Sequence, residues 1–272
     1  MRLGCLAAGI WIALGVIQII PSPTLWAAEA PLHNRLLKLK SIPGNDHRII
    51  VDSTKTPWRA IGRLNRRSGG HCTATVIAPK LVLTAAHCLW NKRTNRYLPA
   101  QAFHFVAGWS KGEYLFHSKA KTIHPAPAYE KNISKKMKAF THDWAVVELH
   151  NNPIPVTGLI TPQKLEGRKF QARDANTGPY TQAGYSADKH QVLTAHINCA
   201  IWGIDKNLNL ALHGCNALPG DSGSPMIIQH SNGDYRLIAI HVGYAATGGS
   251  GTGIAVPAST FLHQINQFKK PR

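Results

Sequence analysis

The sequence predicts an all-β protein, a sandwich or barrel, on three observations. From Ile49 onward, short runs rich in Val, Ile, Leu and aromatic residues recur between Gly, Pro, Asn or Ser residues, a pattern typical of strands and turns. Only residues 258–269 show helical spacing of apolar residues. The chain has 272 residues, 44% hydrophobic and 16% charged, so it can bury a core, and a disordered or low-complexity protein is excluded.

Nine apolar runs are expected to be strands, and they fall into two groups. In chain order they are Ala60–Leu64, Thr73–Ile77, Leu81–Thr84, Phe103–Ala107, Trp144–Leu149, Gln191–Ile201, Pro225–Ile228, Arg236–Val242 and Gly253–Val256. A break in composition with three prolines, at residues 151–167, separates the first five from the last four. It is the best candidate boundary between two β halves. The helical face at the end of the chain comprises Phe261, Leu262, Ile265 and Phe268.

The first 30 residues have the layout of a secretory signal peptide. A positive start at Arg2 precedes an apolar run, Leu3 to Ile20, and prolines and small residues follow, so cleavage is expected within Ala27–Ala30. An uncleaved anchor is the alternative, because the run approaches the roughly 18–20 residues that span a bilayer. We expect a secreted or periplasmic protein, with residues 31–48 as a propeptide or disordered lead-in.

Four cysteines remain in the exported chain, since Cys5 lies in the signal segment. In an oxidising compartment they predict two disulfides, for which three connectivities exist. We favour Cys72 with Cys88 and Cys199 with Cys215, because each bond then links one half of the chain to itself. The partners in each pair are 16 residues apart, unlike the close ligand pairs of zinc sites, and no metal or other cofactor is predicted.

Three short segments carry residues of catalytic type. Leu83–Cys88 places His87 at the end of an apolar strand, His142–Leu149 places an acid directly before a strand, and Pro219–Pro225 places Ser222 in a glycine-containing turn. Taken singly, each has a structural interpretation: a buried histidine, a strand start and a turn. Together they supply a hydroxyl nucleophile, an imidazole to take its proton and a carboxylate to orient the imidazole.

The three motifs stand in the order His, Asp, Ser: Thr84-Ala85-Ala86-His87-Cys88, Asp143-x-Ala145 and Gly220-Asp221-Ser222-Gly223-Ser224-Pro225. With them the chain resembles the chymotrypsin-like, trypsin-fold serine proteases over about residues 49–269. The resemblance implies a serine endopeptidase that forms an acyl-enzyme, with His87 as general base and then acid, Asp143 as its orienting carboxylate and Ser222 as nucleophile. The N–H groups of Gly220 and Ser222 would form the oxyanion hole.

The same resemblance implies the family's fold, two six-stranded antiparallel β-barrels with a C-terminal helix. The protease domain would occupy 49–272, with the first barrel at about 49–155, the second at about 165–257 and the helix at about 258–269. The site would lie in the crevice between the barrels. The pairing of Cys72 with Cys88 matches the family's disulfide beside the catalytic His.

Ser224 and the gap of 79 residues between Asp143 and Ser222 point to the bacterial branch of the family. The segments Pro57-Trp58-x-x-Ile61-Gly62 and Ile238-Ala239-Ile240-His241-Val242-Gly243 resemble its glutamyl endopeptidase group.

Four residues are substrate-binding candidates by this resemblance: Asn216, Ala217, His241 and Gly243. His241 could read an acidic side chain, line a small apolar pocket or be a packed strand residue. Neutral Asn216 argues against a pocket for Lys or Arg. Ala217 replaces the hydroxyl that several acid-specific relatives offer, which argues against acid specificity.

Residues Arg48 and Ile49 look like an activation junction, a basic residue followed by apolar ones. By the resemblance, cleavage after Arg48 would free an Ile49 amine that pairs with Asp221. The alternative is that local N–H groups satisfy Asp221 and the leader is trimmed elsewhere.

The formal net charge is +18, and it belongs to the folded body. Five of the 31 basic and two of the 13 acidic residues lie within 1–48, so residues 49–272 carry +15. We expect a monomer that acts on proteins or peptides, binds no specific nucleic acid and associates loosely with anionic surfaces. The alternative is a catalytically silent binding protein with the same fold and a basic surface.

Overall fold

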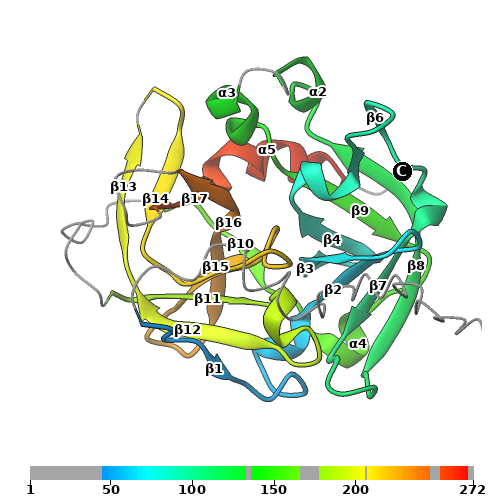
Figure 1. Cartoon of the computed structure of the whole chain (residues 1–272). Coiled ribbons are helices and arrows are strands. Elements are labelled where there is room, and N and C mark those ends of the chain that lie inside the picture. Colours follow the sequence, from blue (N-terminus) through cyan, green and yellow to red (C-terminus); the bar gives the residue numbers. More distant parts are fainter. Residues whose placement is uncertain (1–44, 133–135, 166–177, 206, 246–251, 269–272) are drawn as a thin grey trace, which may run out of the picture.

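Two β bodies lie side by side in the computed structural model, which describes residues 45–132, 136–165, 178–205, 207–245 and 252–268 (Figure 1). The predicted signal peptide, 1–30, and most of the predicted lead-in lie outside the described residues. Among the residues described, no helix is both long and apolar enough to cross a membrane.

Six antiparallel strands close into a barrel in the first body. They are β2 (Ile61–Arg66), β3 (His71–Ala78), β4 (Leu81–Thr84), β7 (Phe103–Ala107), β8 (Phe116–Pro125) and β9 (Ala145–Leu149). The order around the barrel is β2-β3-β4-β9-β8-β7. Strands β3, β4 and β9 are almost wholly buried, because their apolar and small residues occupy both faces. This barrel confirms the prediction for the first half.

The second body is a nine-stranded sheet. Its strands are β1 (Ile49–Ile50), β10 (Thr161–Pro162), β11 (Tyr180–Gly184), β12 (Thr194–Cys199), β13 (Ile201–Asp205), β14 (Leu210–His213), β15 (Pro225–Gln229), β16 (Tyr235–Ala245) and β17 (Thr252–Pro257). The order is β1-β12-β11-β15-β16-β17-β14-β13, and β10 pairs with β16. The fold class is confirmed as mostly β, but only the first barrel is closed by hydrogen bonds within the described chain.

In the second body, one bent segment takes the place of a ring of strands that is closed by hydrogen bonds. Strands β12 and β13 flank Ala200, and one pairs with β11 while the other pairs with β14. Both pairings have a register shift near the bend, and Asn198 has a φ of 59°. Bulges of this kind bend a strand. The continuous segment 194–205 therefore joins the two ends of the five-stranded layer β11-β15-β16-β17-β14.

The structure moves one predicted boundary. Residues 49–155 were expected to form the first barrel, but Ile49 pairs with Ala195 and Ile50 with Thr194. Strand β1 is thus the edge of the second sheet. The reason is its position beyond the turn at residues 52–57, which separates it from β2.

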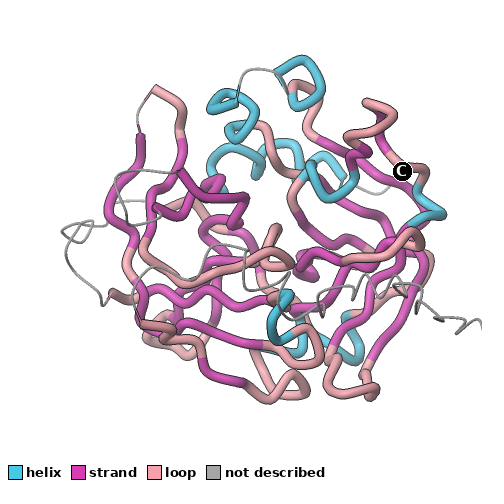
Figure 2. Tube along the Cα trace, in the orientation of Figure 1, coloured by secondary structure: helices cyan, strands magenta, loops and turns pink. Residues whose placement is uncertain are grey.

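Short helices lie around the strands, as Figure 2 shows. They are η1 (Trp58–Ala60), η2 (Ala86–Leu89), η3 (Ala100–Ala102), η4 (Ala187–Lys189), α2 (Tyr129–Asn132), α3 (Lys136–Thr141) and α4 (Ile154–Thr157), and a two-stranded hairpin comprises β5 (Trp90–Asn91) and β6 (Arg96–Tyr97). The predicted C-terminal helix is present as α5 (Ala258–Phe268). It buries Phe261 and Ile265, and the Phe261 ring lies 5.9 Å from that of Trp144 in the first barrel.

Both predicted disulfides are present. Cys72 in β3 is bonded to Cys88 in η2, and Cys199 at the end of β12 is bonded to Cys215 just after β14. Each bond lies within one body and fixes a loop: the first holds the turn that carries His87, and the second holds the bend of the second sheet.

Candidate active site

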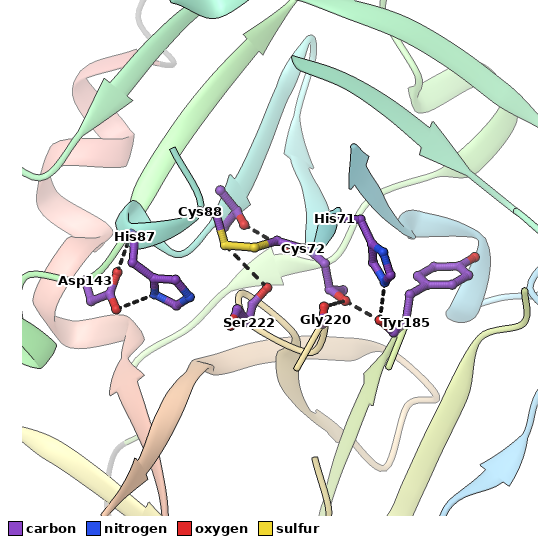
Figure 3. Close-up of a disulfide and its surroundings, with 10 residues drawn as sticks. His71, Cys72, His87, Cys88, Asp143, Tyr185, Gly220 and Ser222 are labelled. Carbon is purple, nitrogen blue, oxygen red and sulfur yellow. Dashed lines mark hydrogen bonds and ion pairs between the residues drawn. A yellow bond between two sulfur atoms is a disulfide. The ribbon is translucent and has the colours of Figure 1, made fainter. Parts of the chain in front are cut away.

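Strand pairing in the first barrel brings His87 and Asp143 together. Strands β4 and β9 are antiparallel, with Thr84 opposite Ala145, so the residues after β4 meet those before β9. The His87 backbone N–H donates to Asp143 Oδ1 at 2.8 Å, and its ring Nδ1 lies 2.7 Å from Oδ2 (Figure 3). The carboxylate is buried, whereas the imidazole is partly exposed.

These two contacts fix the form of the imidazole. A carboxylate only accepts hydrogen bonds, so Nδ1 carries the proton and Nε2 of neutral His87 keeps its lone pair. In Figure 3 the His87 ring lies between Asp143 and Ser222. The geometry therefore provides an oriented base between the first barrel and the loop that bears Ser222.

The Ser222 loop is anchored to both bodies. The Ser222 carbonyl accepts a hydrogen bond from the Thr73 N–H at 2.9 Å and lies 3.8 Å from the Cys88 sulfur. On the other side, Gly223 donates to the His241 carbonyl, and the His241 N–H donates to the Ser224 carbonyl, both at 2.8 Å. The loop is thus held between β3 and β16.

Two glycines give this loop its shape. Gly220 has a φ of +100° and Gly223 a φ of +83°, and a Cβ on either would collide with backbone atoms of neighbouring segments. Only glycine adopts such angles without strain. Within the described residues, the N–H groups of Gly220 and Ser222 donate to no other group. They are free to bind an oxygen, as an oxyanion hole requires.

One group of possible metal ligands lies next to the site. Ligand atoms of Cys72, His87 and Cys88 lie within 4.8 Å of one another. Both sulfurs are consumed by the disulfide, and a metal needs thiolates. The group therefore does not fit a metal ion.

Asp221, between Gly220 and Ser222, is almost completely buried, with 2% of its surface exposed. Its Oδ2 accepts hydrogen bonds from the Ser186 hydroxyl at 2.5 Å and the Leu218 N–H at 2.8 Å. Burial raises the pKa of this carboxyl to about 6, and the two hydrogen bonds oppose that rise.

The predicted activation residues do not meet in the intact chain. Ile49 is in β1 and its side chain is 53% exposed, so Asp221 has its local partners instead. Arg48, in contrast, is buried: its side chain is only 3% exposed. Its guanidinium contacts Ser186, Asp188 and Asp46.

Two buried histidines lie behind the Ser222 loop. His213 accepts a hydrogen bond at Nδ1 from the Cys215 N–H, at 3.2 Å, so its proton is on Nε2. That Nε2 lies 3.1 Å from His241 Nδ1. His241 must then carry its own proton on Nε2. Burial lowers the pKa of both rings, to about 3 for His213, so the pair is neutral at neutral pH.

The other predicted substrate-binding residues surround this pair. The Tyr244 hydroxyl donates to the Ala217 carbonyl at 2.8 Å, and its ring lies 5.1 Å from that of His241. Asn216 donates its N–H to His196 Nδ1, and its side-chain oxygen accepts the His47 N–H. A Cβ at Gly243 would lie 3.0 Å from the Phe140 ring, so this glycine sits close against the first body.

Sequence reasoning missed His213, Ser186 and the burial of Arg48. His213 ends an alternating strand, Leu210-Ala-Leu-His213, and a search for hydrogen-bonded rather than zinc-spaced histidines would have singled it out. Nothing local marks the contact between Arg48 and Ser186, because these two residues are 138 positions apart.

Comparisons with known proteins identify the family of the chain. A family model described as Trypsin matches residues 50–265. The glutamyl endopeptidase of Bacillus licheniformis is 37% identical over 60 residues, which is 22% of this chain and 19% of that protein. The chain thus matches about a fifth of the length of this curated relative.

Two solved structures are similar in fold. A Glu endopeptidase has a TM-score of 0.67 and 22% identity, and the match covers 84% of this chain and 99% of that one. The protease Anisep from Arthrobacter nicotinovorans has a TM-score of 0.56 and 20% identity, covering 78% and 97%. These likenesses establish a shared fold.

Proposed function

Since the chain belongs to the trypsin family of serine proteases, we propose that it is an active endopeptidase in which His87, Asp143 and Ser222 form the catalytic triad. The observation that carries the proposal is the double hydrogen bond between His87 and Asp143. A silent binding protein would have no need of an imidazole held with its lone pair free.

Acylation would begin when His87 Nε2 takes the Ser222 hydroxyl proton as the oxygen attacks the substrate carbonyl. Asp143 stabilises the imidazolium that forms, and the N–H groups of Gly220 and Ser222 stabilise the oxyanion. His87 then protonates the leaving amine, which departs and leaves an ester on Ser222. Water, deprotonated by the same ring, hydrolyses that ester and restores the enzyme.

The test of this mechanism is the Ser222→Ala variant. Loss of the nucleophile should lower kcat by at least roughly 10³-fold. The thermal unfolding midpoint should stay the same, because Ser222 is only partly buried and the change removes one hydroxyl. Ser250→Ala, outside the catalytic motif, is the matched control. Full hydrolysis by Ser222→Ala would contradict the mechanism, and an inactive parent protein would favour the binding protein.

For specificity, we propose that His241 reads an acidic residue before the cleaved bond. The support is the histidine pair, which leaves His241 a donor at Nε2, and the two backbone hydrogen bonds that hold His241 against the Ser222 loop. A donor in a buried setting binds a carboxylate strongly. A mixed peptide library with mass-spectrometric reading of the cut sites tests this, and cuts spread over non-acidic residues would contradict it.

We also propose export of the chain, as residues 1–30 predict, and loose association with anionic surfaces through its basic body. Two disulfides suit an oxidising compartment. N-terminal sequencing of the protein recovered from culture medium or periplasm would locate the cleavage, and retention of residues 1–30 in a membrane fraction would support the anchor instead.

A further inference from the structure

A network of charged groups links the leader segment to the Ser222 loop. Arg48 donates from Nη1 to the Ser186 hydroxyl at 2.6 Å, and from Nη2 to Asp188 at 2.7 Å and Asp46 at 2.9 Å. Lys189 also contacts Asp46, at 2.9 Å. The guanidinium is therefore enclosed by acceptors on the surface of the second body.

The contacts of Ser186 define the direction of its hydrogen bonds. A guanidinium can only donate, so the Ser186 oxygen must accept from Arg48. Its single proton is then available for Asp221, whose Oδ2 lies 2.5 Å away. Arg48 thus contacts the Asp221 carboxylate through one oriented hydroxyl, and both the charge and the hydrogen bond favour the ionised form of Asp221.

The bond after Arg48 is poorly placed for cleavage. The Arg48 side chain is 3% exposed, and Ile49 and Ile50 are paired with β12. An attacking protease must bind the residue before the bond in its own pocket and take the flanking chain in extended form. Cleavage here would need the network and the strand to separate first.

We propose that Arg48 is a positioning residue that supplies the counter-charge for Asp221, so that the catalytic loop is organised without cleavage between Arg48 and Ile49. The inference rests on the proposed function. It replaces the Ile49 amine expected from the sequence with a cation already in the chain. Removal of the leader at any bond before Asp46 leaves the network intact.

The test compares Arg48→Met and Arg48→Lys in the full secreted chain, with Arg67→Met as a matched control because Arg67 is exposed and lies outside the network. Arg48→Met should lower kcat/KM by roughly 10–100-fold, since a charged hydrogen bond is lost. Its acid limb should shift to higher pH, because Asp221 then binds its proton more tightly. Arg48→Lys should keep part of the kcat/KM that Arg48→Met loses, and its acid limb should shift less. Labelling by a serine-directed phosphonate should slow in parallel.

Two results would overturn the proposal: active enzyme that begins at Ile49, or an Arg48→Met variant whose pH profile matches that of the parent. Failure of the proposed function is distinguishable, because the parent itself would then hydrolyse no peptide. In that case the amide hydrogen-exchange rates of residues 218–224 still measure how well the Ser222 loop is ordered. Rates unaffected by Arg48→Met would refute the positioning role.

A second, independent observation is a basic cavity on the first barrel. It has a volume of about 590 Å³, and its lining includes Arg63, Arg66, His104, His117, Trp109 and Tyr114. None of the described residues that line it is an Asp or a Glu. The Arg63 guanidinium lies 5.4 Å from the centre of the Trp109 ring and donates to the His190 carbonyl at 2.9 Å. Among the described residues, the buried Nε atoms of Arg63 and Arg66 have no hydrogen-bond partner.

The cavity adjoins the catalytic region through one residue. Arg63 Nη2 lies 3.4 Å from Nδ1 of His71, whose Nε2 donates to the Tyr185 carbonyl at 2.7 Å. His71 precedes Cys72, which is bonded to the neighbour of His87 (Figure 3). Through these contacts the cavity wall is linked to β3, the strand that carries Cys72.

We infer that this cavity binds an acidic stretch of the protein substrate, remote from the cleaved bond. Arginines in a cavity whose described lining holds no acid attract carboxylates, and the two aromatic walls give the aliphatic parts of a peptide a surface to pack on. The inference also rests on the proposed function.

Peptides with one cleavable sequence and a tail of four Glu or four Gln residues test it. KM for the Glu-tailed peptide should be about tenfold lower, and Arg66→Gln should remove that preference while KM for the Gln tail stays the same. Arg93→Gln, an exposed arginine elsewhere, is the control. Equal KM values for the two tails, or a preference that persists in Arg66→Gln, would overturn it. Hydrolysis of the Gln-tailed peptide separates this failure from loss of the proposed function.

Discussion

At the scale of single residues, the most consequential contact is between His213 and His241. The backbone N–H of Cys215 decides where the proton of His213 lies, and His213 decides the same for His241. A buried histidine alone could expose either a donor or an acceptor to a substrate. This chain of hydrogen bonds leaves a donor, which favours a carboxylate over a cationic side chain.

The His213→Leu variant tests that reading. Leucine keeps much of the buried volume but cannot donate to His241, so the His241 proton is free to move to either nitrogen. We expect kcat/KM for a Glu-containing peptide to fall roughly tenfold, the value of one hydrogen bond, with little change for Ala at that position. His263→Leu on the exposed side of α5 is the control. An unchanged ratio of Glu to Ala cleavage would refute the role.

The raised pKa of Asp221 predicts that activity and stability change in opposite directions with pH. Its pKa is about 6, raised from 3.8 by burial. The native state therefore holds this proton more tightly than the unfolded chain does, so the stabilising contribution of Asp221 declines as pH rises from about 4 to about 6. Hydrolysis should rise as Asp221 ionises, at about pH 5–7, because the ionised carboxylate is a stronger acceptor for the Ser186 proton than the neutral carboxyl.

Chemical unfolding and kcat/KM, measured every half pH unit, check this pair of trends. In Asp221→Asn, the decline in stability between about pH 4 and about pH 6 should disappear. The activity of this variant should be lower at every pH. Asp46 and Asp188 act in the reverse sense: their hydrogen bonds with Arg48 hold both pKa values below the ordinary range. Their contribution is lost as pH falls below about 4. A stability profile that rises steadily from pH 4 to 6 would contradict the assignment for Asp221.

At the scale of elements, α5 connects the two bodies. It packs on β16 and β17, and Phe261 reaches Trp144, the residue after Asp143. The helix therefore supports the carboxylate of the proposed triad from the far end of the chain. A helix with only an apolar face and no partner would not be stable at this length.

Phe261→Ala should cost about 3–5 kcal/mol of unfolding free energy, because it empties a fully buried site. Activity should fall in addition, as the support behind Trp144 is lost. Asn266→Ala, on the exposed face of α5, should change neither quantity by much. Urea unfolding and peptide hydrolysis are the measurements, and a variant with parental stability would show that α5 is peripheral.

At the scale of the whole molecule, the charge of +15 on residues 49–272 predicts that the rate of encounter with substrate depends on salt. Positive charge accelerates the approach of acidic substrates, and added salt screens it, with a Debye length of about 10 Å at 0.1 M. We expect kcat/KM for a Glu-rich protein substrate to fall several-fold between about 0.05 and 0.5 M NaCl, while a neutral peptide changes little. Equal salt dependence for both substrates would show that charge has no role in encounter.

The whole molecule also shows what a sequence can reveal. The His87, Asp143 and Ser222 motifs are local, and apolar runs such as Trp144–Leu149 mark strands directly, so the fold class and the candidate site were predictable. Strand β8 was missed because small and polar residues fill it: Phe116-His-Ser-Lys-Ala-Lys-Thr-Ile-His-Pro125 has no apolar stripe. Its neighbours β7 and β9, rather than its own composition, hold it in place.

Long-range contacts account for the remaining differences. The apolar run Gln191–Ile201 predicts one strand. In the structure the chain bends at Ala200, because β12 before it pairs with β11 and β13 after it pairs with β14. Arg48 reads as a cleavage site, yet acceptors from residues 186–188 bury it. No local pattern records either partner.

The position of α5 after all three motifs has a consequence for the order of synthesis. A ribosome makes His87, Asp143 and Ser222 before it makes Phe261. The ring contact behind Trp144, the residue after Asp143, therefore cannot form until α5 has been made. If the chain acts as proposed, its reactive centre would be consolidated late in synthesis.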